Sequence, residues 1–172
     1  TVTSIGARAF FRCENLTKVS LPKGLTNIES YAFYGCKKLA TITLPSSVTK
    51  IGGGAFNDSG LANITIPPSV TTLGGTPFGG CKNLRAFTVD KANPSFCSID
   101  GVLFDKQGTR LIQYPAGRAG HYTIPTSVTS IAESAFYRCE QLTGVITIPP
   151  KVTRIEERTF QETSLTGVVI PE

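Results

Sequence analysis

Hydrophobic and polar positions recur along this chain with a period of about 23 residues. The stretch from Ile28 to Pro45 reads IESYAFYGCKKLATITLP, and similar stretches begin near residues 5, 28, 51, 73, 131 and 155. A fixed period in this range is typical of a solenoid, in which each repeat packs only against its neighbours. The pattern therefore predicts a single solenoid domain over residues 1–172.

Each repeat contains the segment L-x-x-I-x-L, in which apolar and polar residues alternate. In the second repeat Ile42 and Leu44 point one way and Thr41 and Thr43 the other, which is the period of a half-buried strand. A proline ends the segment at Pro22, Pro45, Pro67, Pro125, Pro149 and Pro171. Proline cannot donate to a strand ladder. We therefore expect these strands to stack into a curved parallel sheet of seven strands on the concave face.

A second apolar region follows each proline and turns inward on the return path. It leads to a short Ala-Phe segment, and six of the ten phenylalanines occupy this one position: Phe10, Phe33, Phe56, Phe78, Phe136 and Phe160. We expect their rings to stack as an aromatic spine in the core. The segment is too short for an independent helix, so a single α or 3₁₀ turn is predicted on the side opposite the sheet.

The pattern breaks between residues 90 and 120, where Asp90 replaces the usual proline. Strand-like runs at Ser98–Phe104 and Thr109–Tyr114 flank Asp105-Lys106-Gln107-Gly108, which predicts an inserted β-hairpin with a four-residue connection. The fold class predicted is thus a mostly β, α/β-type leucine-rich repeat solenoid with one β-hairpin insertion.

Composition and charge narrow the function classes. The net charge is +5, acids lie beside the bases, and no run of five like charges occurs, so nucleic-acid binding is disfavoured. No apolar run approaches the 18 residues or so that span a membrane, and no insertion into a membrane is expected. The chain begins within a repeat and without Met, and we expect it to be a fragment or a processed form of a longer protein.

The cysteines predict structure rather than chemistry. Four of the five occupy one repeat position, and the fifth lies in the insertion: Cys13, Cys36, Cys81, Cys139 and Cys97. A zinc site requires paired Cys or Cys/His spacing, which the chain lacks. Ser59 and Thr163 replace the cysteine in two repeats, which fits a position that needs a small buried side chain able to bond to the backbone. We therefore expect these cysteines to be buried free thiols. A Cys13–Cys36 disulfide and a metal or catalytic role are the alternatives, and Cys97 is the expected reactive thiol if it is exposed.

No catalytic set is visible. The single histidine, His121, lies on a predicted exposed strand position, and nothing in the spacing pairs it with a cysteine. We predict no catalytic residue, no metal site and no cofactor.

Two candidate binding surfaces follow from the alignment of the repeats. The outward strand positions on the concave face are Lys18, Thr41, Thr43, Asn63, Thr65, Thr88, His121, Thr123 and Thr147. Most of these positions hold threonine, which forms a column along the face. The structural interpretation is that β-branched threonine suits an exposed strand. The functional interpretation is that the column is a flat, uncharged platform for a protein or glycan. It contains no Trp, Tyr or Arg, the residues that dominate binding hot spots. The rival surface is a patch near the hairpin formed by Arg110, Tyr114 and Arg118.

The repeats resemble the BspA-like leucine-rich repeat family, also described as the Treponema pallidum type. The resemblance lies in A-F-x-x-C, L-x-x-I-x-I-P and P-x-x-V-T-x-I over nearly the whole chain, and in the insertion from Ser98 to Pro115. It implies a non-enzymatic bacterial protein, cell-surface or secreted, often from gut or oral anaerobes. Family members are usually longer, with an export or lipoprotein signal. Those with known roles bind host proteins such as fibronectin or fibrinogen, or other bacteria.

Three functions are therefore considered. The first is a protein-binding or adhesion module whose partners are host extracellular-matrix proteins or other surface proteins. The second is a structural spacer within a longer surface protein. The third is a glycan-binding module or an enzyme, although no acid/base pair or nucleophile–base set is visible.

Overall fold

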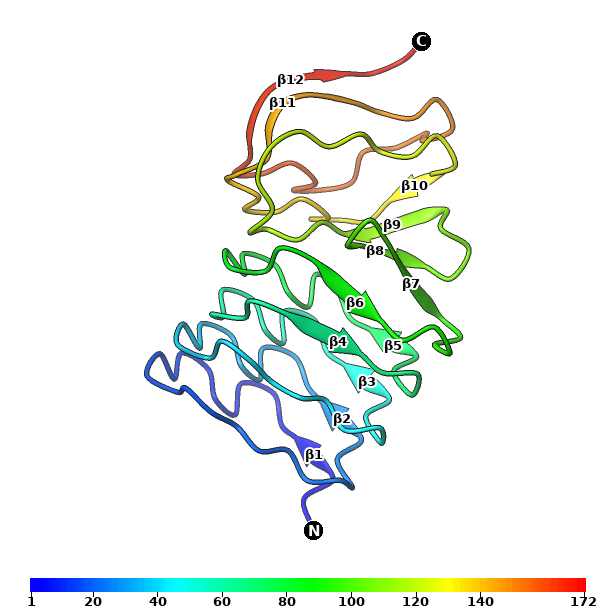
Figure 1. Cartoon of the computed structure of the whole chain (residues 1–172). Coiled ribbons are helices and arrows are strands. Elements are labelled where there is room, and N and C mark those ends of the chain that lie inside the picture. Colours follow the sequence, from blue (N-terminus) through cyan, green and yellow to red (C-terminus); the bar gives the residue numbers. More distant parts are fainter.

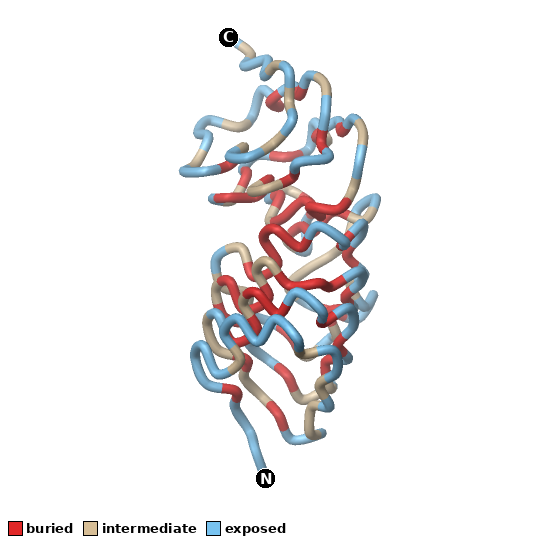
Figure 2. The backbone as a smooth tube through the Cα atoms, turned by 90° about the vertical axis from the view of Figure 1, so that its left-hand side faces the viewer, coloured by how far each residue is buried: buried red, intermediate tan, exposed pale blue.

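The protein is a stack of irregular turns that runs from the N-terminus at one end to the C-terminus at the other (Figure 1). The computed structural model describes all residues, 1–172. Buried residues concentrate along the interior of the stack, between the two sides of each turn (Figure 2). The solenoid predicted from the repeat period is confirmed.

The most regular ladder lies on the return path, where the sequence pattern predicted only inward-turning residues. It is a four-stranded parallel sheet in the order β1-β2-β3-β5. Its strands are β1 (Ser4–Ile5), β2 (Asn27–Ile28), β3 (Lys50–Ile51) and β5 (Thr72–Leu73). The buried isoleucines lie in register, Ile5 beside Ile28 and Ile28 beside Ile51. The V-T-x-I segments therefore contribute backbone pairing as well as core side chains.

The L-x-x-I-x-L segments pair in parallel as predicted, but they form two strand pairs and an isolated bridge from Gly120 to Leu142 rather than a ladder of seven strands. One pair joins β4 (Ile64–Ile66) to β6 (Phe87–Val89). The other joins β11 (Thr143–Thr147) to β12 (Ser164–Val169), with a bulge between Gly144 and Val145. The equivalent segments of the first two repeats form no regular strand.

The insertion forms two hairpins where one was predicted. Its strands are β7 (Phe96–Ile99), β8 (Val102–Asp105) and β9 (Arg110–Gln113), paired antiparallel in that order. The predicted strand Ser98–Phe104 is split by a tight turn at Asp100-Gly101, where φ is 48° and 73°. Positive φ at both turn residues is what a type I′ hairpin requires. The β8–β9 connection has the predicted length.

The insertion also completes the array. β9 pairs in parallel with β10 (Ser130–Ile131), with Leu111 beside Ile131, so β9 takes the place of a return-path strand. At the tip of the first hairpin, the Gly101 carbonyl accepts a hydrogen bond of 2.8 Å from the N–H of Phe87 in β6. The tip therefore occupies the edge of β6, which explains why the L-x-x-I-x-L ladder is interrupted there.

The strand β8 is buried on both faces and joins two hydrophobic cores. Leu103 packs in the N-terminal cluster, whereas Val102 and Phe104 pack in the C-terminal cluster. All three side chains are fully buried. Because side chains alternate across a strand, one short strand contributes to both cores at once.

The stacked aromatic spine is confirmed, but it is divided into two stacks. In the first stack, ring centroids are 5.1, 5.3 and 5.5 Å apart along Phe10, Phe33, Phe56 and Phe78. In the second, Phe136 lies 5.2 Å from Tyr114 and 5.1 Å from Phe160. Tyr114 thus occupies a spine position, which the break in the pattern had concealed.

The Ala-Phe segments form no α or 3₁₀ helix, and only isolated i→i−3 turns, such as the Tyr34 N–H to the Tyr31 carbonyl at 3.2 Å, remain of the predicted helical turn. The residues two before and two after each spine phenylalanine are left-handed: φ is 59° at Tyr31, 68° at Gly35, 55° at Ser134 and 56° at Arg138. A left-handed residue ends a helical turn. The N–H of Phe33 donates to the Ala55 carbonyl of the next repeat at 2.7 Å, so every second backbone bond of the segment runs between turns.

Three of the four repeat cysteines, Cys36, Cys81 and Cys139, are buried and bond to the backbone, as predicted for this position, whereas Cys13 on the first turn is exposed. Cys36 Sγ donates to the Phe10 carbonyl at 3.2 Å, and Cys81 Sγ donates to the Phe56 carbonyl at 3.1 Å. In each case the acceptor belongs to the spine residue of the preceding turn. Ser59 shares the site with Cys81, with 3.3 Å between Oγ and Sγ. All five cysteines are free.

The accessible thiol is Cys13 rather than Cys97. Cys13 is exposed on the first turn, whereas Cys97 is half-buried and its Sγ donates to the Asp105 carbonyl at 3.0 Å. Burial, together with the Asp105 carboxylate, raises the pKa of Cys97.

The spine position of Tyr114 predicts a stabilising substitution. Its hydroxyl is buried without a hydrogen-bond partner, and an unsatisfied buried polar group costs about 1–3 kcal/mol. Tyr114→Phe should therefore raise the free energy of unfolding by about 1 kcal/mol, measured by urea denaturation. Tyr114→Ala is the control and should lose about 3–5 kcal/mol, because it leaves a cavity in the stack. A clear loss of stability in Tyr114→Phe would contradict this account of the hydroxyl.

The buried thiols predict a loss of stability in alkali. Burial raises the pKa of Cys81 to about 12, whereas an unfolded thiol titrates near about 8.5. The protonated Cys81 thiol therefore contributes fully to the free energy of unfolding below about pH 8.5. This contribution declines as the pH rises towards the pKa of the folded state, by up to about 1.4 kcal/mol per pH unit. Cys81→Ser, which copies Ser59, should make the decline between pH 8 and 11 shallower in denaturant titrations. Equal slopes in both proteins would refute the assignment.

Candidate functional site

The threonine face is the set of nine outward positions predicted to bind, and the structure leaves every one of them exposed. They are Lys18, Thr41, Thr43, Asn63, Thr65, Thr88, His121, Thr123 and Thr147. Thr65 and Thr88 lie directly side by side in the β4–β6 pair. The apolar residues before and after each of these two threonines along its strand face inward, so the predicted alternation of polar and apolar positions holds there.

The hydroxyl groups on the two sides of the solenoid are used differently. On the return path, Thr26 and Thr49 donate side-chain hydrogen bonds to the preceding turn, to the carbonyls of Thr3 and Thr26 at 3.0 and 3.3 Å. None of the threonine hydroxyls on the threonine face makes a hydrogen bond within the chain; these residues are Thr41, Thr43, Thr65, Thr88, Thr123 and Thr147. The return-path hydroxyls hold the array together, and those of the threonine face remain available.

The rival patch near the hairpin is not a single accessible surface. Tyr114 is only 1% exposed because its ring belongs to the spine, and burial raises its pKa to about 12. Arg118 forms an ion pair of 2.6 Å with Asp100 and also donates to the Asp100 carbonyl. Its guanidinium lies 5.8 Å from the Tyr114 ring and 5.6 Å from the Tyr122 ring. Arg118 therefore fastens the hairpin tip, and only Arg110 is freely exposed on β9.

Sequence reasoning missed an aromatic cluster on the loop edge, which is the side of the stack that carries the Ala-Phe segments. Phe11 and Tyr34 stack at 4.9 Å, and Tyr31 lies 6.1 Å from Tyr34. The Arg8 guanidinium lies 5.9 Å from the Phe11 ring and 5.7 Å from the Tyr31 ring. The available signal was the residue after each spine phenylalanine, which is aromatic in three of the six Ala-Phe repeats: Phe11, Tyr34 and Tyr137. Tyrosine and arginine are the residues typical of binding hot spots.

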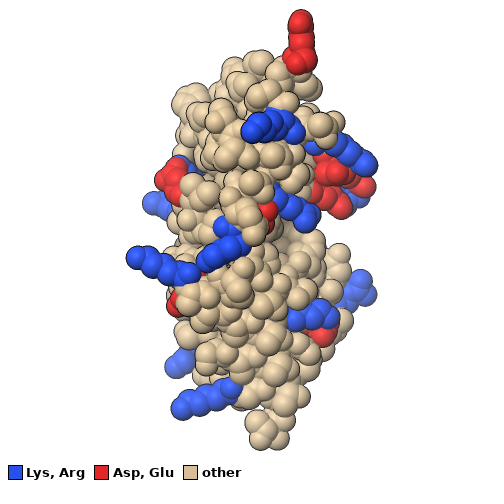
Figure 3. Space-filling view, turned by 90° about the vertical axis from the view of Figure 1, so that its right-hand side faces the viewer, with Lys and Arg blue, Asp and Glu red and all other residues tan.

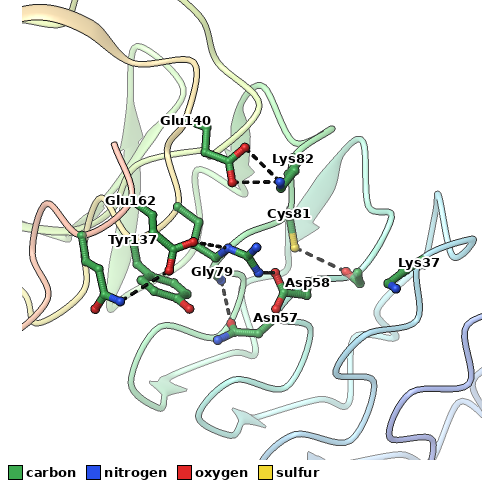
Figure 4. Close-up of polar contacts among 12 residues, drawn as sticks. Lys37, Asn57, Asp58, Gly79, Cys81, Lys82, Tyr137, Glu140 and Glu162 are labelled. Carbon is green, nitrogen blue, oxygen red and sulfur yellow. Dashed lines mark hydrogen bonds and ion pairs between the residues drawn. The ribbon is translucent and has the colours of Figure 1, made fainter. Parts of the chain in front are cut away.

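An ion-pair bridge on the loop edge connects distant repeats (Figure 4). The Arg138 guanidinium lies 2.6 Å from Asp58 and 3.0 Å from Glu162. A Cβ at Gly80 would lie 2.3 Å from the Asp58 carboxylate, so the bridge requires glycine in the turn between. Burial of Arg138 opposes its charge, but these two carboxylates outweigh it and raise the pKa of Arg138. A second pair, Lys82 with Glu140 at 2.8 Å, spans the same interval.

The titratable side chains that the sequence pattern suggested for chemistry lie apart from one another. No three His, Cys, Asp or Glu side chains are close enough to hold a metal ion. The His121 ring lies over Gly144, where a Cβ would come within 2.1 Å of Nδ1, and it does not pair with a cysteine. No helix combines the length and apolar character needed to cross a membrane. On the face drawn in Figure 3, the basic side chains are scattered rather than gathered into a patch.

Comparison with solved structures shows which proteins share this fold. A pneumococcal vaccine antigen, PcpA, superposes with a TM-score of 0.80 and 31% identity, over 88% of this chain and 38% of that chain. A leucine-rich repeat protein from Eubacterium ventriosum gives 0.72 and 26%, over 96% and 58% of the two chains. The Treponema pallidum leucine-rich repeat protein gives 0.52 and 25%, over 98% and 66%. This chain thus spans about 38% and 58% of the length of the first two.

Comparison with family sequence patterns identifies the repeats. No curated protein matches the chain. The family described as the BspA type leucine rich repeat region matches in six copies, over residues 1–110 and 118–172. The unmatched interval, 111–117, contains all of β9 except Arg110 and the short, irregular turn with Tyr114. The chain therefore belongs to the BspA type leucine-rich repeat family.

Proposed function

We propose that this chain is a non-enzymatic repeat module of a bacterial cell-surface or secreted protein, and that it binds a protein partner through the threonine face. Membership of the family and the likeness to a pneumococcal vaccine antigen support the placement at the surface. The partner class is a host extracellular-matrix protein or another surface protein. The remaining argument concerns the chemistry of the face itself.

The observation that carries the proposal is the column of unused hydroxyl groups. A threonine hydroxyl both donates and accepts, so the column matches a partner's backbone or polar side chains. Threonine is β-branched and stiff at χ1, so little side-chain entropy is lost when a partner binds. Thr65 and Thr88 are also held in strand register by β4 and β6. The face is therefore preorganised for many weak hydrogen bonds rather than for one strong anchor.

Charge indicates which partners the face favours. Only two of its nine positions can ionise, Lys18 and His121, and neither is acidic. A neutral or acidic protein surface meets no like-charge repulsion there, whereas a strongly basic surface gains nothing. The face contributes selectivity through shape and hydrogen bonding more than through electrostatic steering.

A second candidate function is a spacer that separates other parts of a longer surface protein. The observation in its favour is that the threonine face carries no Trp, Tyr or Arg, and such residues supply most of the energy in protein interfaces. A spacer needs only a stiff array, which the return-path ladder and the spine provide. A measured ligand for the threonine face distinguishes the two functions.

A binding screen with matched variants tests the proposal. We expect saturable binding of the 172-residue chain to at least one immobilised protein from a panel of host extracellular-matrix proteins, measured by surface plasmon resonance at physiological salt. The double variant Thr65→Lys, Thr123→Lys should weaken it by about tenfold or more, because buried unpaired charges would enter the interface.

The control is Thr72→Lys, which places the same change at an exposed threonine of β5 on the return path. Its affinity should equal that of the unaltered chain. Loss of binding on Arg110→Ala alone would move the site to the hairpin, and the absence of any ligand in the panel would favour the spacer.

A further inference from the structure

One turn of the solenoid is shorter than the others on the loop edge. In a regular repeat, the spine residue follows the inward isoleucine by five positions, as in Ile28 and Phe33. In the turn that begins with β9, Tyr114 follows Leu111 by only three. Leu111 lies in register with Ile131, so it takes the place of the inward isoleucine. Tyr114 stacks on Phe136, so it takes the place of the spine phenylalanine. This turn therefore lacks the two residues that project at the loop edge.

The short turn leaves a gap in the backbone ladder between turns. At the equivalent position, the N–H of Tyr31, Gly54 and Ser134 each donates to the next turn at 3.0 Å. The N–H of Thr76 has no acceptor within the chain, because the turn that would supply it is missing. The Thr76 hydroxyl instead reaches the Glu133 carbonyl at 3.3 Å, across the gap. The two walls touch at that point, so no further strand fits between them.

Above that contact the gap opens into a hollow of about 400 Å³, which is at the small end of the range of about 300–1,000 Å³ for small-molecule sites. We call it the notch. Besides glycines, its lining includes Tyr31, Asn57, Thr76, Glu133, Tyr137 and Arg158. It is distinct from the threonine face, with which it shares no residue.

A glycine keeps the notch open although the backbone does not require one. The φ of Gly75 is not in the left-handed region, and a Cβ there would meet no atom within 4 Å. The equivalent residues of the other Ala-Phe repeats are Ala7, Ser30, Gly53, Glu133 and Glu157. The absence of a side chain at Gly75 therefore leaves space rather than relieving strain.

Two tyrosines line the notch. The Tyr31 ring covers Gly54, lying 2.6 Å from the position that a Cβ would take there. Arg8 and Tyr34 support the same ring from behind. Tyr137 comes from the far side of the gap and also lines the notch. A ligand with a flat apolar face can pack against such rings.

The polar groups indicate a neutral ligand rich in hydroxyls. Glu133 and Arg158 carry opposite charges, so the lining gives no net preference for an anion or a cation. The unpaired Thr76 N–H offers a donor, and the Asn57 amide both donates and accepts. A pyranose combines C–H faces that pack on aromatic rings with a rim of hydroxyls that donate and accept. We propose that the notch binds a neutral sugar, one or two units long, with Tyr31 and Tyr137 against its faces.

Titration with simple glycosides tests this assignment. The probes are the methyl α- and β-glycosides of glucose, galactose, mannose and N-acetylglucosamine, with methyl glucuronoside as the charged comparison. Binding is followed by ¹H–¹⁵N spectra of the 172-residue chain. We expect at least one neutral glycoside to shift the amides of Thr76 and its neighbours saturably at millimolar concentration.

Matched variants locate the site. Gly75→Gln fills the notch and should weaken binding by about tenfold or more, as should Tyr137→Ala. Gly6→Gln is the control, because a Cβ at Gly6 also meets no atom within 4 Å and that residue lies on the first turn. Its affinity should be unchanged, and circular dichroism confirms that each variant is folded.

Three results would overturn the proposal: no saturable shift with any neutral glycoside, full affinity in Gly75→Gln, or tighter binding of the glucuronoside. Failure here leaves the protein-binding proposal intact, because Thr65→Lys, Thr123→Lys alters a different face and is read out with protein ligands.

Discussion

The structure depends on bonds that run from each turn to the next, with one aromatic ring per turn setting their register. The N–H of Phe33 donates to Ala55 of the following repeat while its ring stacks 5.3 Å from Phe56. A stacked ring and a directed hydrogen bond at the same residue allow only one alignment of neighbouring turns. The left-handed residues at either side of the ring, such as Tyr31, aim the loop so that both can form. A helix within the Ala-Phe segment would use these backbone groups for its own hydrogen bonds, which is why no helix forms.

That dependence also explains the seam in the middle of the molecule. Where the repeat is lost, strand β8 replaces the missing contacts because its buried Leu103 packs in one core and its buried Phe104 in the other. The side chain of Gln113 supplies the acceptor for the Phe78 N–H, at 3.3 Å, that a backbone carbonyl supplies elsewhere. The Asp58–Arg138 pair closes the loop edge over the same interval. These three contacts together replace the contacts between turns that a regular repeat would make.

The two proposed binding surfaces arise from opposite consequences of repetition. Regular repeats place the same residue type at equal intervals, which yields the threonine face with its free hydroxyls. The irregular turn does the reverse: it leaves the Thr76 N–H unpaired and opens the notch beside Tyr137. A broad face suits a protein, whereas a small preorganised hollow suits a single sugar. Both lie on one stiff array, so neither requires the chain to rearrange on binding.

The sequence by itself determined the solenoid, the spine, the buried thiols and the outward threonines, because each follows from a short repeat that interacts only with its neighbours. Only the tertiary structure decided the rest. Tyr114 reads as an exposed hairpin residue until β9 is seen to pair with β10, which makes it part of the spine. The notch and the Asp58–Arg138 bridge join residues far apart in the chain, across the irregular turn. A periodic pattern predicts contacts between adjacent repeats, but not which groups meet when a turn loses two residues.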